Sequence, residues 1–146
     1  MEKTKVVNLK EGGRFSFLGF DFRLSRNREG KTYVSKTPRK KKRQEIGKKI
    51  KAALKANWNK PRKEVIQAVN AIIRGWVNYF RIGNSNSAFS KVRDYLEMKV
   101  RKFVLRRKKL KGFGWKRWSR EEIYGKWGLY NDYRIRYVYP KAKPSR

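Results

Sequence analysis

Residues 69–80 read V-N-A-I-I-R-G-W-V-N-Y-F, and this stretch decides the fold because its apolar residues repeat at helical spacing. The apolar stripe begins one turn earlier and comprises Val65, Val69, Ile72, Ile73, Trp76 and Phe80. The residues expected on the opposite, polar face are Lys63, Gln67, Asn70, Arg74, Asn78 and Arg81. Pro61 suits the first helical position and Gly83 marks the end. The sequence therefore predicts an amphipathic helix at the centre of a small core.

Gly75 lies inside this predicted helix, where glycine costs about 1 kcal/mol relative to alanine. We interpret it as a close-packing position that lets a neighbouring helix approach beside Trp76. On that interpretation, Gly75→Val is expected to overpack the contact and to cost about 1–3 kcal/mol.

Two further helices are predicted on either side of the central one. The upstream stripe consists of Ile46, Ile50, Ala53, Leu54 and Trp58, and the downstream stripe of Phe89, Val92, Leu96, Val100, Phe103 and Val104. The short connection at residues 59–61 favours antiparallel neighbours. Glu97 and Arg101 are spaced as an i,i+4 pair, which we expect on the surface and worth about 0.3 kcal/mol.

The segment before the helices is rich in phenylalanine. Residues 15–24 alternate imperfectly, and the phase slips at Leu18-Gly19, which suggests a β-bulge. After a polar turn at residues 26–30, residues 32–34 are predicted to return as the second strand of a hairpin. Residues 1–10 are predicted to hold a further short strand, which ends at the turn 11–13. This apolar hairpin is expected to dock on the helices or on another protein.

The last third of the chain is divided by glycines into short pieces. Ser119 and Glu122 form the S-x-x-E pattern of a helix start, so we assign Glu122 a capping role. Residues 133–139 alternate like a strand. The tryptophans of this region are interpreted as core residues in preference to base-stacking ones, and residues 140–146 as a basic tail.

These patterns predict a mainly α fold with a small β part. The expected regions are a β-hairpin at 1–37, a three-helix bundle at 38–111 and an aromatic-rich basic module at 112–146.

Charge narrows the possible partners. The 146 residues include 42 Lys and Arg against 11 Asp and Glu, a formal net charge of +31, which attracts polyanions. Aromatic residues make up 14% of the chain, which indicates a folded core and not a disordered tail. A membrane surface is the weaker alternative, because no run of about 18 apolar residues exists to span a bilayer. No signal peptide is recognised, so we expect a protein that is not secreted.

The chain contains neither cysteine nor histidine. This removes thiolate nucleophiles, the usual zinc ligands and the commonest general base. The acidic residues are scattered, without the convergent carboxylates of a two-metal centre. We therefore predict no catalytic residue, no metal site and no cofactor.

We predict which cations contact nucleic acid from their positions on the expected helix faces alone. Clustered cations oppose the macrodipole at a helix N-terminus, so the run at 39–43 favours a phosphate partner. The candidate RNA-binding residues are Arg39, Lys40, Lys41, Lys42, Arg43, Lys48, Lys51, Lys55, Arg74, Arg81, Arg106, Arg107, Lys108, Lys109, Lys116, Arg117, Arg134 and Arg136.

The run F-L-G-F at 17–20, the basic helix after it and R-G-W-V-N-Y-F at 74–80 resemble the maturase-specific region of group II intron reverse transcriptases. Residues 2–7 resemble the segment after the polymerase active site in those proteins, and residues 133–140 resemble their ending. The resemblance implies a reverse-transcriptase thumb, or X domain, preceded by the last hairpin of the palm. It also implies binding to intron RNA during folding and splicing, and contact with the template–primer duplex during copying.

The paired aspartates of that family's catalytic turn are absent, and the lack of histidine excludes its H-N-H endonuclease module. We therefore expect a non-catalytic C-terminal part of such a protein, in the bacterial cytoplasm or an organelle.

Several functions stay open at this point. The first is an RNA-binding maturase-type domain whose partner is structured RNA, which the resemblance implies to be group II intron RNA. The second is a subunit that completes a split reverse transcriptase by docking its hairpin on a separate palm-containing polypeptide. The third is a non-specific structural RNA- or DNA-binding protein, and the fourth is a decaying fragment without a selected function.

Overall fold

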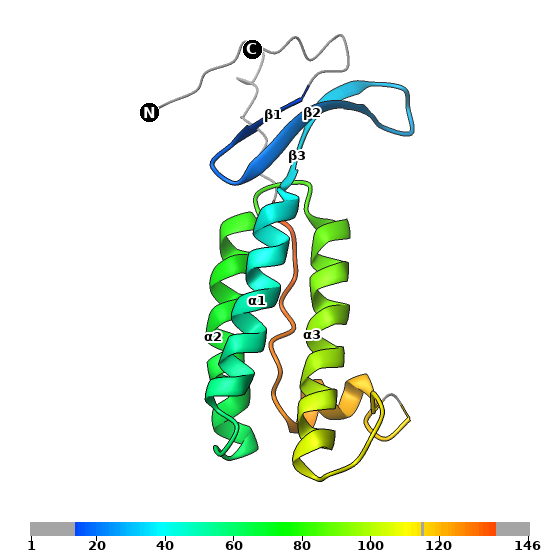
Figure 1. Cartoon of the computed structure of the whole chain (residues 1–146). Coiled ribbons are helices and arrows are strands. Elements are labelled where there is room, and N and C mark those ends of the chain that lie inside the picture. Colours follow the sequence, from blue (N-terminus) through cyan, green and yellow to red (C-terminus); the bar gives the residue numbers. More distant parts are fainter. Residues whose placement is uncertain (1–13, 115, 137–146) are drawn as a thin grey trace.

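The computed structural model describes residues 14–114 and 116–136, and it places a small sheet at one end of a helical bundle (Figure 1). The strands are β1 (Arg14–Phe17), β2 (Phe20–Arg26) and β3 (Thr32–Pro38). The helices are α1 (Lys40–Ala56), α2 (Arg62–Phe80) and α3 (Asn86–Arg107), followed by the π-helical turn η2 (Glu122–Lys126). The predicted mainly α fold with a small β part is confirmed. The strand and turn predicted within residues 1–13 and the tail at 140–146 lie outside the described residues.

The phenylalanine-rich segment forms two strands and not one bulged strand. Phe17 pairs directly with Phe20, so the chain reverses at Leu18-Gly19 within the antiparallel order β1-β2-β3. Leu18 has φ 53° and Gly19 φ 85°, the left-handed pair that a two-residue hairpin turn requires. The predicted bulge is therefore wrong. The Tyr79 hydroxyl donates to the Leu18 carbonyl at 2.6 Å and holds this unusual leucine in place.

The sheet is fixed to the bundle through its second and third strands. Phe20 is buried, and its ring lies 4.9 Å from that of Phe80 at the end of α2. The backbone N–H of Asn84 donates to the Lys36 carbonyl at 2.6 Å, and the Lys36 N–H donates back to Asn84 Oδ1 at 3.0 Å. A Cβ on Gly83 would lie 2.6 Å from that same carbonyl, so only glycine fits the junction. The hairpin thus docks on the helices, as predicted.

The three predicted apolar stripes form the core. Val65, Val69, Ile73 and Phe80 of α2 are buried, while Ile72 and Trp76 are partly buried against the same cluster. The stripe residues of α3 are buried throughout, as are Ile46, Ile50 and Leu54 of α1. Trp58 lies beyond the end of α1 and is exposed on one side, with its ring edge-on to Phe103. Pro61 directly precedes α2.

Gly75 does not occupy a helix crossing. It is exposed, and a Cβ built on it would meet no heavy atom within 4 Å. The predicted close approach and the overpacking expected for Gly75→Val are both wrong. The helices meet through Val69, Ile73 and Val77 on the buried side of α2, away from Gly75.

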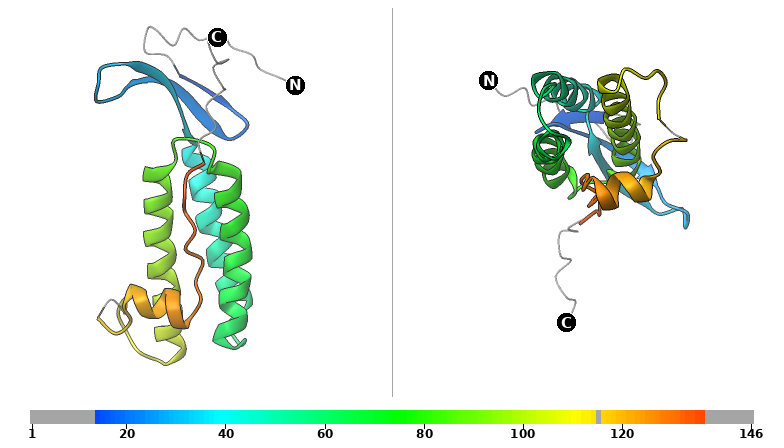
Figure 2. Two further views of the ribbon diagram at one scale, coloured as in Figure 1. Left: turned by 180° about the vertical axis from the view of Figure 1, so that it is seen from behind. Right: turned by 90° about the horizontal axis from the view of Figure 1, so that it is seen from below.

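The C-terminal region packs on the bundle. Trp118, Ile123, Trp127 and Leu129 are buried in the same cluster as the helices, which confirms the core interpretation for these two tryptophans. Ser119 Oγ accepts from the backbone N–H of Glu122 at 3.2 Å, so the predicted cap forms. From η2 the chain continues in extended form between α2 and α3, on the side away from α1 (Figure 2).

This extended segment, residues 127–136, is not a strand of the sheet in its described part. Its backbone is instead held by side chains of α2 and by a bond from the Arg136 N–H to the Arg81 carbonyl at 2.7 Å. The strand predicted at 133–139 is therefore wrong for residues 133–136, and residues 137–139 lie outside the described part. Within the described ranges, no helix is long and apolar enough to cross a membrane.

Candidate nucleic-acid interface

A groove runs between α1 and α3 on the face that the extended segment leaves open. Its α1 wall carries Lys40, Arg43, Lys48 and Lys51, and Lys91 stands on the α3 wall. Its remaining lining consists of Gln44, Ile46, Gly47, Val92 and Tyr95. Cationic walls over a largely uncharged floor can hold a polyanionic backbone.

Helical spacing in both helices builds this groove. Positions 40, 43 or 44, 47 or 48 and 51 of α1 recur every three or four residues and therefore share one face. Gly47 sits where Tyr95 of α3 leans across, because a Cβ at that position would lie 3.5 Å from the tyrosine ring. Because Gly47 has no side chain, the Tyr95 ring forms this part of the groove floor.

Cations crowd one another along this face. Partial burial, and then the nearby charges of Lys102, Lys51 and Arg106, lower the pKa of Lys99. Lys99 Nζ lies 5.5 Å from the centre of the Tyr95 ring. Arg43 Nε is buried and has no hydrogen-bond partner among the described residues. Binding of an anion would reduce the repulsion between these neighbouring cations.

The acidic side chains that form ion pairs are placed elsewhere, and no described residue that lines the groove is acidic. Glu45 lies on the other side of α1 and pairs with Lys42 at 3.6 Å. The remaining pairs are Asp21 with Arg39, Asp94 with Arg93 and Arg120, Glu97 with Arg101 and Arg120, and Asp132 with Arg81 and Arg134. The lining of the α1–α3 groove therefore carries positive charge without an acidic partner in the groove.

The predicted cations of α1 divide between this groove and other positions. Lys40, Arg43, Lys48 and Lys51 line it together. Arg39 precedes the helix and lies 4.0 Å from Asp21. Lys42 faces a second groove, between α1 and α2. Lys41 and Lys55 are exposed, outside the lining of either groove.

The predicted cations at the end of α3 form a separate group, far from the sheet. Arg107 donates to the Lys60 carbonyl at 2.7 Å, and Lys109 takes a left-handed φ of 59° where the helix ends. Lys108 and Arg117 lie over the Trp118 ring. Arg106 and Lys116 are exposed.

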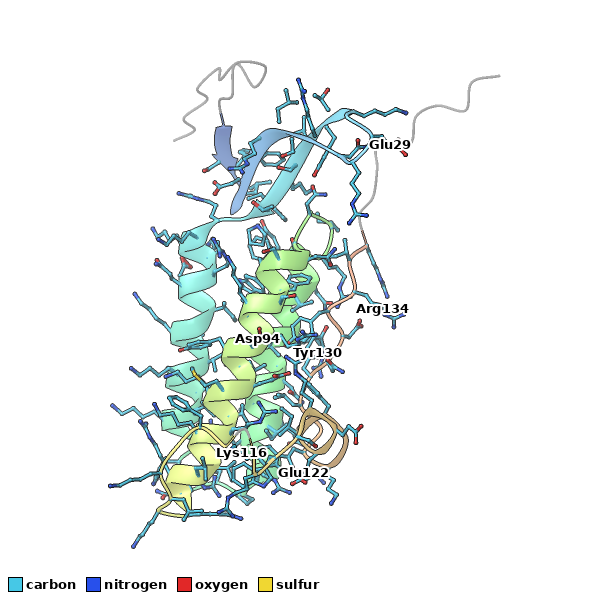
Figure 3. All side chains as sticks on the ribbon, turned by 90° about the vertical axis from the view of Figure 1, so that its right-hand side faces the viewer. Glu29, Asp94, Lys116, Glu122, Tyr130 and Arg134 are labelled. Atoms are coloured by element: carbon cyan, nitrogen blue, oxygen red, sulfur yellow. The ribbon has the colours of Figure 1, made fainter. Side chains whose placement is uncertain are left out.

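Arg81 is not on an exposed face, and this prediction is wrong. The side chain is 6% exposed because it lies under the extended segment, whose Tyr130 and Arg134 are labelled in Figure 3. Its guanidinium donates to Asn78 Oδ1, to the Tyr130 hydroxyl and to the carbonyls of Asp132 and Arg134. Arg81 is thus committed to holding the extended segment.

The other predicted cations on that side stay at the surface. The Arg74 guanidinium lies 5.7 Å from the centre of the Tyr130 ring. Arg134 is exposed and pairs with Asp132 at 3.4 Å, and Arg136 is exposed. They stand apart from the α1–α3 groove.

Glu97 and Arg101 are also misplaced by the sequence analysis. Both are buried, at 0% and 2% exposed, and their ion pair of 3.8 Å lies in the core and not on the surface. Glu97 also accepts from Arg120 Nε at 3.0 Å and from the Tyr124 hydroxyl. Burial, and then this hydrogen bond, raise the pKa of Tyr124, so the phenol stays a donor.

Three lysines of α3 were missed, namely Lys91, which lines the groove, and Lys99 and Lys102, which lie farther along the same helix. A signal for them exists in the sequence, because Lys91, Tyr95, Lys99, Lys102 and Arg106 recur at steps of four, four, three and four. The apolar stripe of the same helix is the stronger period and obscures this cationic one.

Comparison with known families gives one finding that agrees with this geometry. The family model described as group II intron, maturase-specific domain matches residues 36–125. The match covers the end of β3, all three helices and most of η2. A search of curated proteins found no match.

Proposed function

The chain belongs to the group II intron maturase-specific domain family, and on this premise we propose that its α1–α3 groove binds folded intron RNA. A domain of this family is a maturase-type domain in group II intron splicing. The proposal adds which surface meets the RNA. In a reverse transcriptase that contains the domain, the same face would hold the template–primer duplex.

The observation that carries the proposal is the unbalanced charge of the groove. Cations from two helices face each other there, Lys99 is crowded by its neighbours, and the lining has no acid among the described residues. Binding would release counterions from the RNA, which gives affinity but little sequence selectivity. Selectivity would come from the fit of the helical ridges to a folded RNA surface. The domain would supply binding and no catalytic group.

The test compares a structured group II intron RNA with a random-sequence duplex of equal length. Each is titrated with the full chain between about 50 and 200 mM salt, where a protein with 6–10 phosphate contacts loses roughly 10³ to 10⁵ in affinity. We expect the intron RNA to keep its advantage at the high-salt end. If both affinities fall together, the protein is a non-specific polyanion binder and the proposal fails.

A matched pair of variants locates the interface. Replacing Lys48, Lys51 and Lys91 with Gln removes three charges from the groove. The control replaces Lys31, Lys63 and Lys126, which are exposed on other surfaces. The groove variant should flatten the salt dependence by roughly 0.7–0.9 per lost contact, and the control should not. Equal effects would place the RNA elsewhere.

A second candidate function is completion of a reverse transcriptase in trans. The specific observation is the hairpin tip, where Phe17 and Leu18 are 52% and 66% exposed beside the exposed Tyr79. We propose as its test the mixing of this chain with a palm-containing polypeptide. DNA synthesis should appear only on mixing. Leu18→Asn keeps a residue that tolerates the left-handed turn but removes the apolar contact, so it should abolish the effect.

A further inference from the structure

The loop after α3 exposes a phenylalanine. Phe113 is 49% exposed and lies between Gly112, with φ 107°, and Gly114, with φ 79°. Its ring borders a hollow whose cationic rim is Lys111, Lys116 and Arg117. The buried Trp118 and Trp127 cannot offer a ring face to a ligand in this way.

The backbone on both sides of Phe113 is fixed, so its exposure is imposed by the fold. The Leu110 N–H donates to the Leu105 carbonyl at 2.9 Å, and the Trp118 N–H donates to the Gly114 carbonyl at 3.1 Å. A Cβ on Gly114 would lie 3.2 Å from side-chain atoms of Arg101, Leu105 and Trp118. Gly114 is therefore pressed against α3, and the preceding residue points outward.

The charge around this ring has one sign. Lys102 Nζ lies 5.2 Å from the centre of the Phe113 ring, and the sequence from Met98 to Arg120 contains no acidic residue. Lys102 belongs to the row of cations along α3 that also includes Lys99 and Arg106. An aromatic ring among cations is the arrangement that binds single-stranded nucleic acid, because bases stack on the ring while cations take the phosphates.

We propose that Phe113 stacks on an unpaired base of the bound RNA, with Lys111, Lys116 and Arg117 contacting its phosphates. The inference rests on the proposed function, since it assumes an RNA ligand, but it concerns a different end of the bundle. Bases in a continuous duplex are already stacked on one another, so this site selects a loop, a bulge or a strand end.

The experiment uses the full chain and two probes of equal length, a short oligoadenylate and an abasic oligomer with the same backbone. Phe113→Ala should weaken binding of the oligoadenylate by about 5- to 150-fold, the range for one lost stacking contact. Binding of the abasic oligomer should not change, because no charge is removed. Phe113→Trp should keep the affinity, since tryptophan also offers a ring face.

Leu110→Ala is the matched control, because Leu110 is an exposed apolar residue of the same loop that cannot stack. It should bind both probes as the wild type does. An equal loss on both probes, or a loss with Leu110→Ala as large as with Phe113→Ala, would overturn the stacking site in favour of a structural role. Neither probe is intron RNA, so this result is independent of whether the α1–α3 groove prefers a folded intron.

Discussion

The two sides of helix α3 differ in whether their charged residues are paired with residues of opposite charge. Toward α1 the helix presents Lys91 to an open groove whose described lining has no acid, and Lys99 and Lys102 follow farther along the helix. Toward η2 it presents Asp94 and Glu97, which are paired with cations and partly covered by the C-terminal region. The same helix therefore has an open cationic side and a side that belongs to the core.

The comparison of the two sides shows where a chain of net charge +31 places its few acidic residues. Self-repulsion destabilises a compact basic protein, and a buried cation without a partner costs more than an exposed one. Here carboxylates accompany the buried Arg81 and Arg101, whereas the groove cations keep only solvent and one another. The imbalance marks the face that is available to a polyanion.

The largest loss of stability is expected when the buried carboxylate of Glu97, on the covered side of α3, is removed. Glu97→Ala leaves the Arg101 guanidinium in the core without its acidic partner, and it removes the acceptor of Arg120 and Tyr124. We expect a loss of about 3–5 kcal/mol in the free energy of unfolding, measured by urea denaturation. Glu121→Ala, at an exposed acid next to Arg120, should change stability by less than about 0.5 kcal/mol. Similar losses in both variants would contradict the buried ion pair.

A smaller effect is expected where α2 holds the extended segment. Arg81→Met keeps the bulk of the side chain but loses the bonds to Tyr130, Asp132 and Arg134. The expected cost is about 1.5–3 kcal/mol, the range for hydrogen bonds to a charged group. Hydrogen exchange should also accelerate at residues 129–136. Lys63→Met, at an exposed lysine near the start of the same helix, is the control, and unchanged exchange in Arg81→Met would show that the segment is held by its apolar contacts alone.

Local patterns were sufficient to predict the helices, because each apolar stripe is set by the 3.6-residue period within its own segment. They were also sufficient for the cations of α1 that line the groove, since one helix face carries them. The three helices and the α1 wall of the groove could therefore be predicted from the sequence.

The predictions that were wrong concern residues whose surroundings depend on contacts between distant segments. Arg81 looked exposed because nothing in residues 62–80 reveals that residues 127–136 return to cover it. Glu97 and Arg101 have the spacing of a surface pair, and only the approach of Arg120 and Tyr124 makes their site a buried one. The turn at Leu18-Gly19 was read as a bulge because a leucine seldom adopts φ 53° without an outside partner such as Tyr79.

Gly75 offers a milder test, on the face between α1 and α2. The structure leaves space for a Cβ there, so Gly75→Ala should gain about 0.5–1 kcal/mol from helix propensity alone. Thermal unfolding of the variant measures this. Gly47→Ala is the informative companion, because its Cβ would touch the Tyr95 ring and its gain should be smaller. A destabilised Gly75→Ala would mean that a neighbouring segment does approach this side of α2.

The smallest effect is expected on the open face, and it has opposite signs for folding and for binding. Lys99→Gln removes one cation from among Lys51, Lys102 and Arg106, so it should raise the free energy of unfolding by roughly 0.3 kcal/mol while weakening RNA binding. The pKa of Lys99 is lower in the folded chain than its ordinary 10.5, so the folded state holds fewer protons just below that pH. The wild-type penalty therefore fades as pH rises through this window, and the advantage of Lys99→Gln should fade with it. Paired denaturation curves at neutral and alkaline pH measure the first effect and RNA titration the second. A variant that loses both stability and affinity would show that Lys99 belongs to the core side of α3 and not to the open groove.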